Sequence, residues 1–390
     1  WEELGLEKRA LLSLGKWDHD GDAFNMTALA FRTAAARNAV SKLHAQVSQR
    51  IWHSLWTESA GERAPVSHVT NGVHLPSWLA PELADLLDRY LGNEWLEHQD
   101  DAEVWDRVEA MPDDELWAVH LQLKRRLFDY LRQRSSEAWV AGMPPEQLAS
   151  TGLLLDPEAL TICFARRFTE YKRPFLVLHD VPRLQRILND TRRPVQLVFA
   201  GKAHPADFPS KHLIHQIYSR AVDRTFRGRI AFVQDYDLEL ASHLVRGADV
   251  WLNTPRRLHE ASGTSGMKAA LNGVLHLSTP DGWWHEGYNG ANGWSIGDDG
   301  ERVDPAEEDR ADAESLYSLL ENQVVPLFYD RDRDGVPHGW IRIMKESVRS
   351  IAPAFSARRM LRRYVEAMYT WVPQAGSATN PTPVETALGH

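Results

Sequence analysis

Residues 260–273 combine a loop of small residues with a lysine, a pairing that could bind an anion beside a carbonyl group. The loop follows the apolar run 248–252, which is typical of a buried strand, and leads into residues 267–271, which favour a helix. Such a loop leaves backbone N–H groups free at the start of a helix, where the helix dipole also favours an anion. Lys268 lies just inside the expected helix, so its amine could bond to a carbonyl cofactor. The alternative is a tight turn followed by a surface lysine.

Four basic residues within residues 164–173 form a second candidate site. Arg167 and Lys172 bracket a turn that leaves an expected strand. Arginine offers phosphate a planar, bidentate fork, and lysine offers it a compact charge. By composition alone, these residues predict a phosphate site or, equally, a solvated basic turn.

The complete string of the first segment, Glu260-Ala-Ser-Gly-Thr followed by Met267-Lys and Leu271-Asn-Gly, resembles the pyridoxal-phosphate lysine segment of the α-glucan (glycogen and maltodextrin) phosphorylases. Its Thr-Ser-Gly-Met-Lys variant is similar to the shorter bacterial and archaeal branch. Five further segments resemble the same family: residues 24–30, 38–44, 69–78, 164–173 and 201–205. The resemblance spans most of residues 24–369 but includes only the last part of the amino-terminal domain, so we expect a carboxyl-terminal fragment.

The resemblance implies roles for individual residues of this chain. It implies that Lys268 carries pyridoxal 5′-phosphate covalently and that Arg167 and Lys172 hold orthophosphate. Further cofactor contacts are expected from Arg166, Tyr236, Thr264 and Ser265. Substrate contacts are expected from Asn71, Tyr171, Lys202, Glu260, Ser262 and Gly263. Thr169 stands where the animal enzymes have a histidine, which is a departure from the family's pattern.

The reaction that the resemblance implies is retaining phosphorolysis of an α-1,4-glucan to α-glucose 1-phosphate. The cofactor phosphate would exchange a proton with the attacking orthophosphate, while the ring would not act as an electron sink. Two phosphates in contact repel each other, which explains a need for several cations and loop N–H groups together. Glu260 is then expected to bind a sugar hydroxyl, not to act as a general acid.

Three alternatives remain open from the sequence. A cofactor-free nucleotide-sugar glucosyltransferase of the glycogen or starch synthase type shares the fold, the Arg-x4-Lys pair and a glutamate before a glycine-containing loop. A serine hydrolase is suggested by Gly293-Trp-Ser-Ile-Gly297, although a polar loop follows where a helix is needed. Alternatively, the chain as given turns over glucan poorly, because the loops that close the family's cleft from the amino-terminal side are missing.

From residue 160 onward, short apolar strands alternate with helices, and this pattern predicts a doubly wound α/β fold that would position the two candidate sites. Strands are expected at residues 160–165, 195–200, 230–233, 249–252 and 274–277. Helices are expected at residues 25–56 (two), 78–91, 114–141, 173–188, 211–223, 238–246, 267–271, 304–327 and 337–369. Both candidate sites follow strands, at the edge of such a sheet where ligands bind.

The resemblance also implies a glycosyltransferase-B type architecture of Rossmann-like domains. We expect residues 1–70 to end the amino-terminal domain and residues 71–336 to form the cofactor- and phosphate-binding domain. Residues 337–372 would be closing helices. Residues 373–390, rich in Pro, Thr, Ser and Gly, predict a disordered tail.

The composition and the net charge of the chain indicate which partners and which cellular location to expect. The 390 residues carry a net charge of −10, which argues against nucleic acid or an anionic membrane as the main partner. Cys163 is the only cysteine, so no intrachain disulfide can form, and a reducing, cytoplasmic location is expected. We expect no metal, because the calcium- and zinc-like patterns are incomplete. The sequence leaves a homo-oligomer open.

Overall fold

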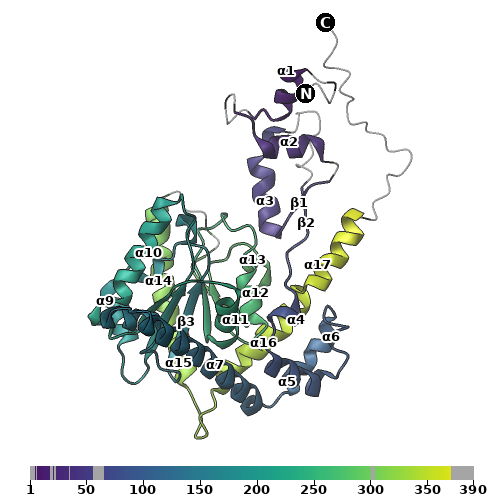
Figure 1. The fold of residues 1–390 in the computed structure, drawn as a ribbon. Helices are drawn as coiled ribbons and strands as arrows, with labels where there is room; N and C mark the ends of the chain where they lie inside the picture. Colours follow the sequence, from purple (N-terminus) through teal and green to yellow (C-terminus); the bar gives the residue numbers. More distant parts are fainter. Residues whose placement is uncertain are drawn as a thin grey trace.

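A computed structural model describes residues 5, 7–17, 21, 23–34, 36–55, 66–298, 300 and 304–369. Its centre is a six-stranded, entirely parallel sheet with the order β5-β4-β3-β6-β7-β8 (Figure 1). The strands are β3 (Leu160–Ala165), β4 (Val195–Ala200), β5 (Ile230–Val233), β6 (Val250–Asn253), β7 (Leu275–Ser278) and β8 (Gly293–Ser295). Successive strands run outward from β3 in one direction and from β6 in the other, so the order reverses between β3 and β6.

Both faces of the sheet are buried, as the continuous apolar strands require. Alternate side chains of β3 serve the two faces: Ile162 and Phe164 enter the larger core, and Cys163 and Ala165 the smaller one. The larger core includes side chains from α5 (Pro81–Leu91), α9 (Val181–Leu188), α10 (Phe208–Ala221), α14 (Pro305–Leu319) and α16 (His338–Ala354). The smaller core includes side chains from α7 (Asp113–Val140), α11 (Leu238–Gly247) and α12 (Ser265–Ala270). The result is a three-layer α/β/α arrangement.

Aspartates begin several of the covering helices. The side chains of Asp180, Asp207, Asp237 and Asp304 cap α9, α10, α11 and α14 by accepting a backbone N–H of the first turn. Proline occupies an early position in α9, α10 and α14, where its missing N–H costs nothing. The remaining helices are α1 (Lys8–Leu14), α2 (Met26–Thr33), α3 (Lys42–Ile51), α4 (Leu75–Trp78), α6 (Ala102–Trp105), α8 (Pro145–Leu148), α13 (Trp284–Gly287), α15 (Val325–Tyr329) and α17 (Ala357–Tyr364).

The amino-terminal segment stands apart from the sheet and is reached by the last helices (Figure 1). It contains α1 to α3 and a short parallel pair, β1 (Asn38–Ala39) and β2 (Ser67–His68). From β2 the chain crosses the end of α16, where the Val73 N–H donates to the Phe355 carbonyl at 2.8 Å. Beyond this crossing, α17 returns to the segment, and Asn38 Nδ2 donates to the Tyr364 hydroxyl at 2.8 Å. Helix α17, part of the expected closing segment 337–372, therefore contacts the amino-terminal segment.

The sheet confirms the predicted fold class, with three corrections to the elements. The expected strands 249–252 and 274–277 each lie one residue further along the chain. The edge strand β8 was missed because its three residues, Gly293-Trp-Ser295, form too short a run to show an apolar pattern. The helix expected at 173–188 is wrong in its first half, since Arg173 has φ +43° and α9 starts only at Val181. The expected tail, residues 373–390, lies outside the described residues.

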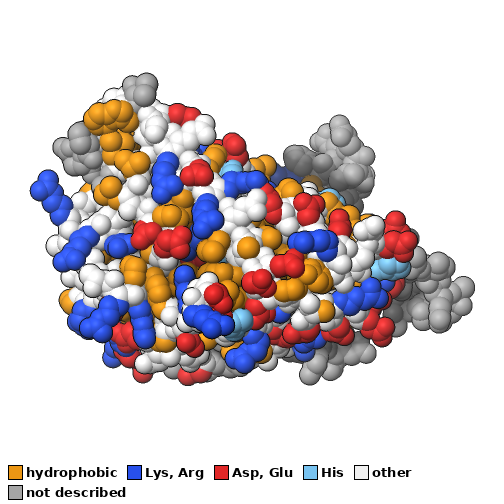
Figure 2. All heavy atoms as spheres, turned by 90° about the horizontal axis from the view of Figure 1, so that it is seen from below, with side chains coloured by type: hydrophobic (Ala, Val, Ile, Leu, Met, Phe, Trp, Pro, Cys, Tyr) orange, Lys and Arg blue, Asp and Glu red, His pale blue; other side chains and the backbone are white. Residues whose placement is uncertain are grey.

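The surface carries charges of both signs. On the face seen from below, Lys and Arg side chains lie interspersed with Asp and Glu (Figure 2). No described helix has both the length and the apolar character needed to cross a membrane.

Candidate active site

The candidate site lies at the carboxyl ends of β3 and β6, where the strand order reverses. Ligands of open α/β sheets bind in the crevice at this point. Here the loop after β3 runs beside the loop after β4, because the Phe168 N–H donates to the Lys202 carbonyl at 3.0 Å. Gly201 permits this approach: a Cβ on it would lie 2.0 Å from the Arg166 carbonyl oxygen, and its φ is +153°. Its glycine is therefore a structural requirement of the loop that holds the basic residues.

Two cations of the β3 loop converge on one carboxylate of the β6 loop. Arg166 Nη2 and Lys172 Nζ each lie 2.7 Å from Glu260 Oε2. Their side chains are 7%, 7% and 12% exposed, respectively. Arg166 Nε and Nη1 are buried without a hydrogen-bond partner among the described residues. The cluster has an excess positive charge and unused donors, which suit an anion.

The electrostatics of the cluster follow from its burial. Burial, reinforced by the charge of Arg166 and opposed by Glu260, lowers the pKa of the Lys172 amine to about 8. Burial also works against ionisation of Glu260, but Arg166 and Lys172 hold the pKa of its carboxyl below the usual value. Two charged bases therefore face one charged acid at neutral pH. A dianion bound beside them would favour the charged form of Lys172.

Lys268 lies on α12, as expected, with its amine half-buried against an aromatic ring. Its Nζ is 3.6 Å from the centroid of the Trp78 ring, and burial lowers the pKa of the amine. Asn272 holds the two segments together by donating to the carbonyls of Trp78 and Lys268. A Cβ on Gly266 would lie 2.4 Å from the His276 ring, so a glycine lets α12 pack closely on β7. A less basic amine is a better nucleophile at neutral pH.

The small-residue loop presents polar groups with few protein partners. The Ser262 hydroxyl is buried and has no hydrogen-bond partner among the described residues. Thr264 precedes α12 without a side-chain cap bond, whereas the Ser265 hydroxyl accepts from Trp251 Nε1 at 3.2 Å. Gly263 has φ +83°, which folds the loop back towards Glu260. Ser265 is thus a partly structural residue, while Ser262 has capacity for a ligand.

The remaining expected residues differ in how close they lie to the cluster. Burial raises the pKa of both Tyr171 and Tyr236, and the charge of Arg166 acts against the shift in each, so both phenols lie near it. The side chains of Arg167 and Lys202 are exposed. Asn71 is half-buried, and its carbonyl accepts from Arg359 Nη2 at 3.3 Å. The structure therefore brings Arg166, more directly than Arg167, together with Lys172.

Sequence reasoning missed two residues of the site. Trp78 lies within residues 69–78, but nothing local indicated that its ring would cover the lysine amine. Asp281 is buried, and its carboxylate accepts the N–H groups of Glu260 at 2.8 Å and Gly282 at 2.9 Å. Burial raises the pKa of Asp281 to about 6. The Pro280-Asp-Gly282 turn was the available signal, because Asp and Gly are typical turn residues.

The geometry also bears on the serine hydrolase alternative and on metals. Ser295 ends the edge strand β8, and the described residues 296–298 that follow it form no helix. A nucleophile elbow needs a strand, a sharp turn and a helix in direct succession, which this segment lacks. Among the described residues, no group of three or more His, Cys, Asp or Glu side chains could hold a metal ion.

Comparison with known proteins assigns the family. A model described as "Phosphorylase: Carbohydrate phosphorylase" matches residues 7–286. The chain belongs to the carbohydrate phosphorylase family. Among its relatives, a glycogen phosphorylase of Aquifex aeolicus is 48% identical, over 94% of this chain and 52% of the relative. A maltodextrin phosphorylase of Thermococcus litoralis is 45% identical, over 94% of this chain and 43% of the relative.

A glycogen phosphorylase of Mycobacterium tuberculosis is 41% identical, over 94% of this chain and 42% of the relative. The chain thus spans about half the length of the curated relatives it matches. The family model covers strands β3 to β7 and both candidate loops, and β8 lies beyond its last matched residue.

Proposed function

We propose that the full-length protein containing this chain is an α-1,4-glucan phosphorylase. It transfers a terminal glucosyl unit of glycogen or maltodextrin to orthophosphate and releases α-glucose 1-phosphate with retention. The observation that carries the proposal is the convergence of Arg166 and Lys172 on Glu260 at the reversal point of the sheet. Family membership and the printed names of the relatives support the same activity.

The residues fit pyridoxal 5′-phosphate as the cofactor. A half-buried amine with a lowered pKa is suited to covalent attachment of a carbonyl group. Arg166, Tyr236, Thr264 and Ser265 would hold the cofactor, with the unpartnered Arg166 donors directed to its phosphate. Bound there, the cofactor supplies a phosphate that exchanges a proton with the substrate phosphate. The protein's part is to hold Lys268 against the Trp78 ring, which covers one side of its amine.

Orthophosphate would bind between the two basic residues assigned to it. The exposed Arg167 can present its guanidinium fork to an anion that enters the cleft, and Lys172 already faces the interior. The excess positive charge of the cluster compensates for the repulsion between two neighbouring phosphates. Lys202, exposed on the adjacent loop, would add positive charge at the entrance.

The glucosyl unit would be held by groups on the β6 loop and around it. Glu260 Oε2 accepts hydrogen bonds from Arg166 and Lys172, so Oε1 is left for a sugar hydroxyl. The buried Ser262 hydroxyl and the Gly263 backbone are further hydrogen-bonding groups, with Tyr171 and Asn71 on neighbouring segments. Glu260 is a poor general acid here, since its pKa is held low. Proton transfer is therefore assigned to the phosphates.

The nucleotide-sugar transferase is the weaker alternative. It would need the basic pair and Glu260 but no lysine amine on α12. The family match and the relatives, which are phosphorylases by name, favour phosphorolysis. A cytoplasmic location is part of the proposal, consistent with glucan and phosphate as substrates and with a buried, unpaired Cys163.

The test measures glucose 1-phosphate release by the full-length protein from maltodextrin and phosphate, with and without added pyridoxal phosphate. We expect cofactor-dependent release, and a cofactor absorbance band that is lost in Lys268→Ala. The exposed Lys211→Ala serves as the control and should keep both. Transfer from a nucleotide sugar without any cofactor band would contradict the proposal. The 390-residue chain alone is expected to turn over glucan poorly, and robust release by it would refute that part.

A further inference from the structure

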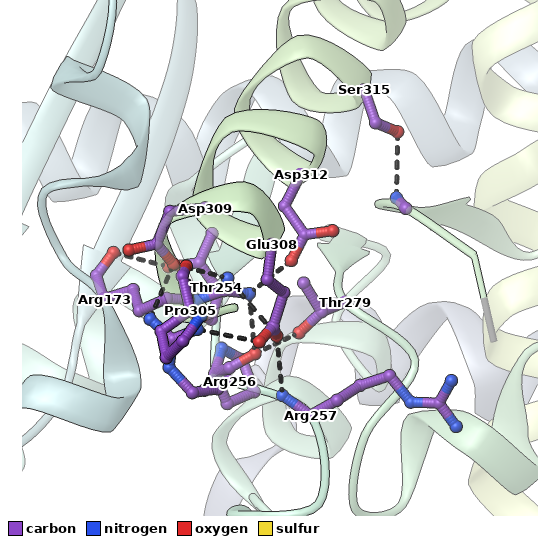
Figure 3. Close-up of polar contacts among 12 residues, drawn as sticks. Arg173, Thr254, Arg256, Arg257, Thr279, Pro305, Glu308, Asp309, Asp312 and Ser315 are labelled. Atoms are coloured by element: carbon purple, nitrogen blue, oxygen red, sulfur yellow. Dashed lines mark hydrogen bonds and ion pairs between the residues drawn. The ribbon is translucent and has the colours of Figure 1, made fainter. Parts of the chain in front are cut away.

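Arg173 follows Lys172 directly and is fully buried, with 0% exposure and a left-handed backbone at φ +43°. Only a few non-glycine residues adopt this conformation, and the surrounding contacts must hold it in place. Figure 3 shows its guanidinium enclosed between the β3 loop, the β6 loop and α14. None of the roles assigned above to the reaction explains this burial.

The side chain of Arg173 joins the two loops that carry the site. Its Nε donates to the Thr254 carbonyl at 3.0 Å, and its Nη2 donates to the Pro255 carbonyl at 3.0 Å (Figure 3). The Thr254 hydroxyl reaches in the opposite direction, to the carbonyls of Lys172 at 3.0 Å and Arg173 at 2.9 Å. The Arg256 N–H donates to the Tyr171 carbonyl at 2.6 Å. Hydrogen bonds therefore connect the β3 loop to the β6 loop at several successive residues, close to the contact between Lys172 and Glu260.

Carboxylates of α14 fix the remaining donors of Arg173. Nη1 lies 2.9 Å from Asp309 Oδ1, and Nη2 lies 2.6 Å from Asp312 Oδ2. Arg256 binds the same helix, with 2.7 Å contacts to Glu308 and Asp309 (Figure 3). Both loops are thus tied to one helix by ion pairs, which are buried at Arg173 and half-buried at Arg256.

We propose that Arg173 is a positioning residue that sets the separation of the β3 and β6 loops and so places Lys172 against Glu260. Arginine is required because its planar fork bonds two carbonyls and two carboxylates at once, whereas a lysine amine is a single point of charge. The expected effect on turnover rests on the proposed function, but the position of Lys172 can be tested without measuring turnover.

The first test is Arg173→Lys, which keeps the charge and removes the fork. Acetylation of Lys172 by acetic anhydride, read by peptide mass spectrometry, reports the local opening, since Lys172 is 6% exposed in the intact site. We expect acetylation at least about tenfold faster. We also expect a loss in kcat/KM for phosphate of up to about a hundredfold, the scale of effect that a 1 Å misplacement has. The change in kcat should be smaller.

Two controls separate positioning from general loosening. Arg183 also binds α14, through Glu314, but it lies on α9 and touches neither loop. The substitution Arg183→Lys weakens this ion pair. It should leave both measurements unchanged. Lys345, which is also buried but lies on α16, should keep its slow acetylation in Arg173→Lys. Equal acceleration at Lys345 and Lys172, or an unchanged rate at Lys172, would overturn the inference.

If Arg173→Lys does not fold, Asp309→Asn decides the question. This substitution removes one carboxylate but keeps the shape of the side chain and the hydrogen bonds from Arg173 to the two carbonyls. We therefore expect the same changes in acetylation and in phosphate kinetics, both smaller than in Arg173→Lys. Their absence in this folded variant would overturn the inference. Failure of the proposed function has a separate signature: the wild-type protein would release no glucose 1-phosphate, while the acetylation result for Lys172 would still stand.

Discussion

Replacing Lys172 with methionine should stabilise the free protein while removing its affinity for phosphate. Lowering the pKa of the amine from 10.5 to about 8 means that the folded state disfavours the charged form. One pKa unit corresponds to about 1.4 kcal/mol, so the charged amine costs the folded state about 3 kcal/mol. Methionine has a similar length and no charge. Glu260 is not left alone in the variant, because Arg166 remains 2.7 Å from it.

The pH dependence of this cost has a definite sign. Below pH 8 the amine is charged in both the folded and the unfolded state, and the full cost applies. Between pH 8 and 10.5 the unfolded chain binds more protons than the folded one, so the free energy of unfolding contributed by this group rises with pH. Above pH 10.5 the cost has disappeared.

Urea unfolding of Lys172→Met and wild type at pH 7 and pH 10 measures the difference. We expect the variant to be more stable by about 1–3 kcal/mol at pH 7, less than the full cost because a hydrogen bond to Glu260 is lost. The advantage should shrink at pH 10. Added orthophosphate should stabilise the wild type and not the variant. A variant that is less stable at pH 7, or a difference that does not depend on pH, would refute the reasoning; Lys211→Met is the control for an exposed lysine.

Two further predictions concern the support of the site. In Asp281→Asn we expect the loss of one pH-dependent contribution: burial raises the pKa of this carboxyl to about 6, so the folded wild type binds the extra proton and gains stability as pH falls from 6 towards 4. Unfolding midpoints at pH 5 and 7, relative to wild type, measure this, and parallel shifts at both pH values would contradict it. Gly201→Ala should destabilise the protein by at least about 1–3 kcal/mol and weaken phosphate binding, because its Cβ would collide with the Arg166 carbonyl. Gly335→Ala is its control, since it shares a positive φ but has open space around it; equal losses in thermal unfolding would argue against a steric cause.

The pattern of apolar runs was sufficient to predict most of the sheet. Strands β3, β4 and β5 have the predicted bounds, since each is a continuous apolar run that a parallel, doubly covered sheet requires. The helix predicted at 173–188 was wrong in its first half because long-range contacts, not a local pattern, decide the structure there. Its helical start is overridden by Arg173, whose side chain is drawn into the interior by groups more than 80 residues away. Local propensity cannot anticipate such a contact.

The sequence by itself determined the family, the parallel sheet and the identity of the lysine and basic segments, because these are carried by contiguous residues and by short-range periodicity. The assignment of individual ligand contacts stays a prediction. Only the tertiary structure decided that Arg166 and Lys172 share Glu260, that Trp78 covers Lys268 and that Asp281 supports the loop. These pairs join residues that lie between 21 and 190 positions apart in the chain. Burial of such charges shifts their pKa values, and burial is a property of the folded chain alone.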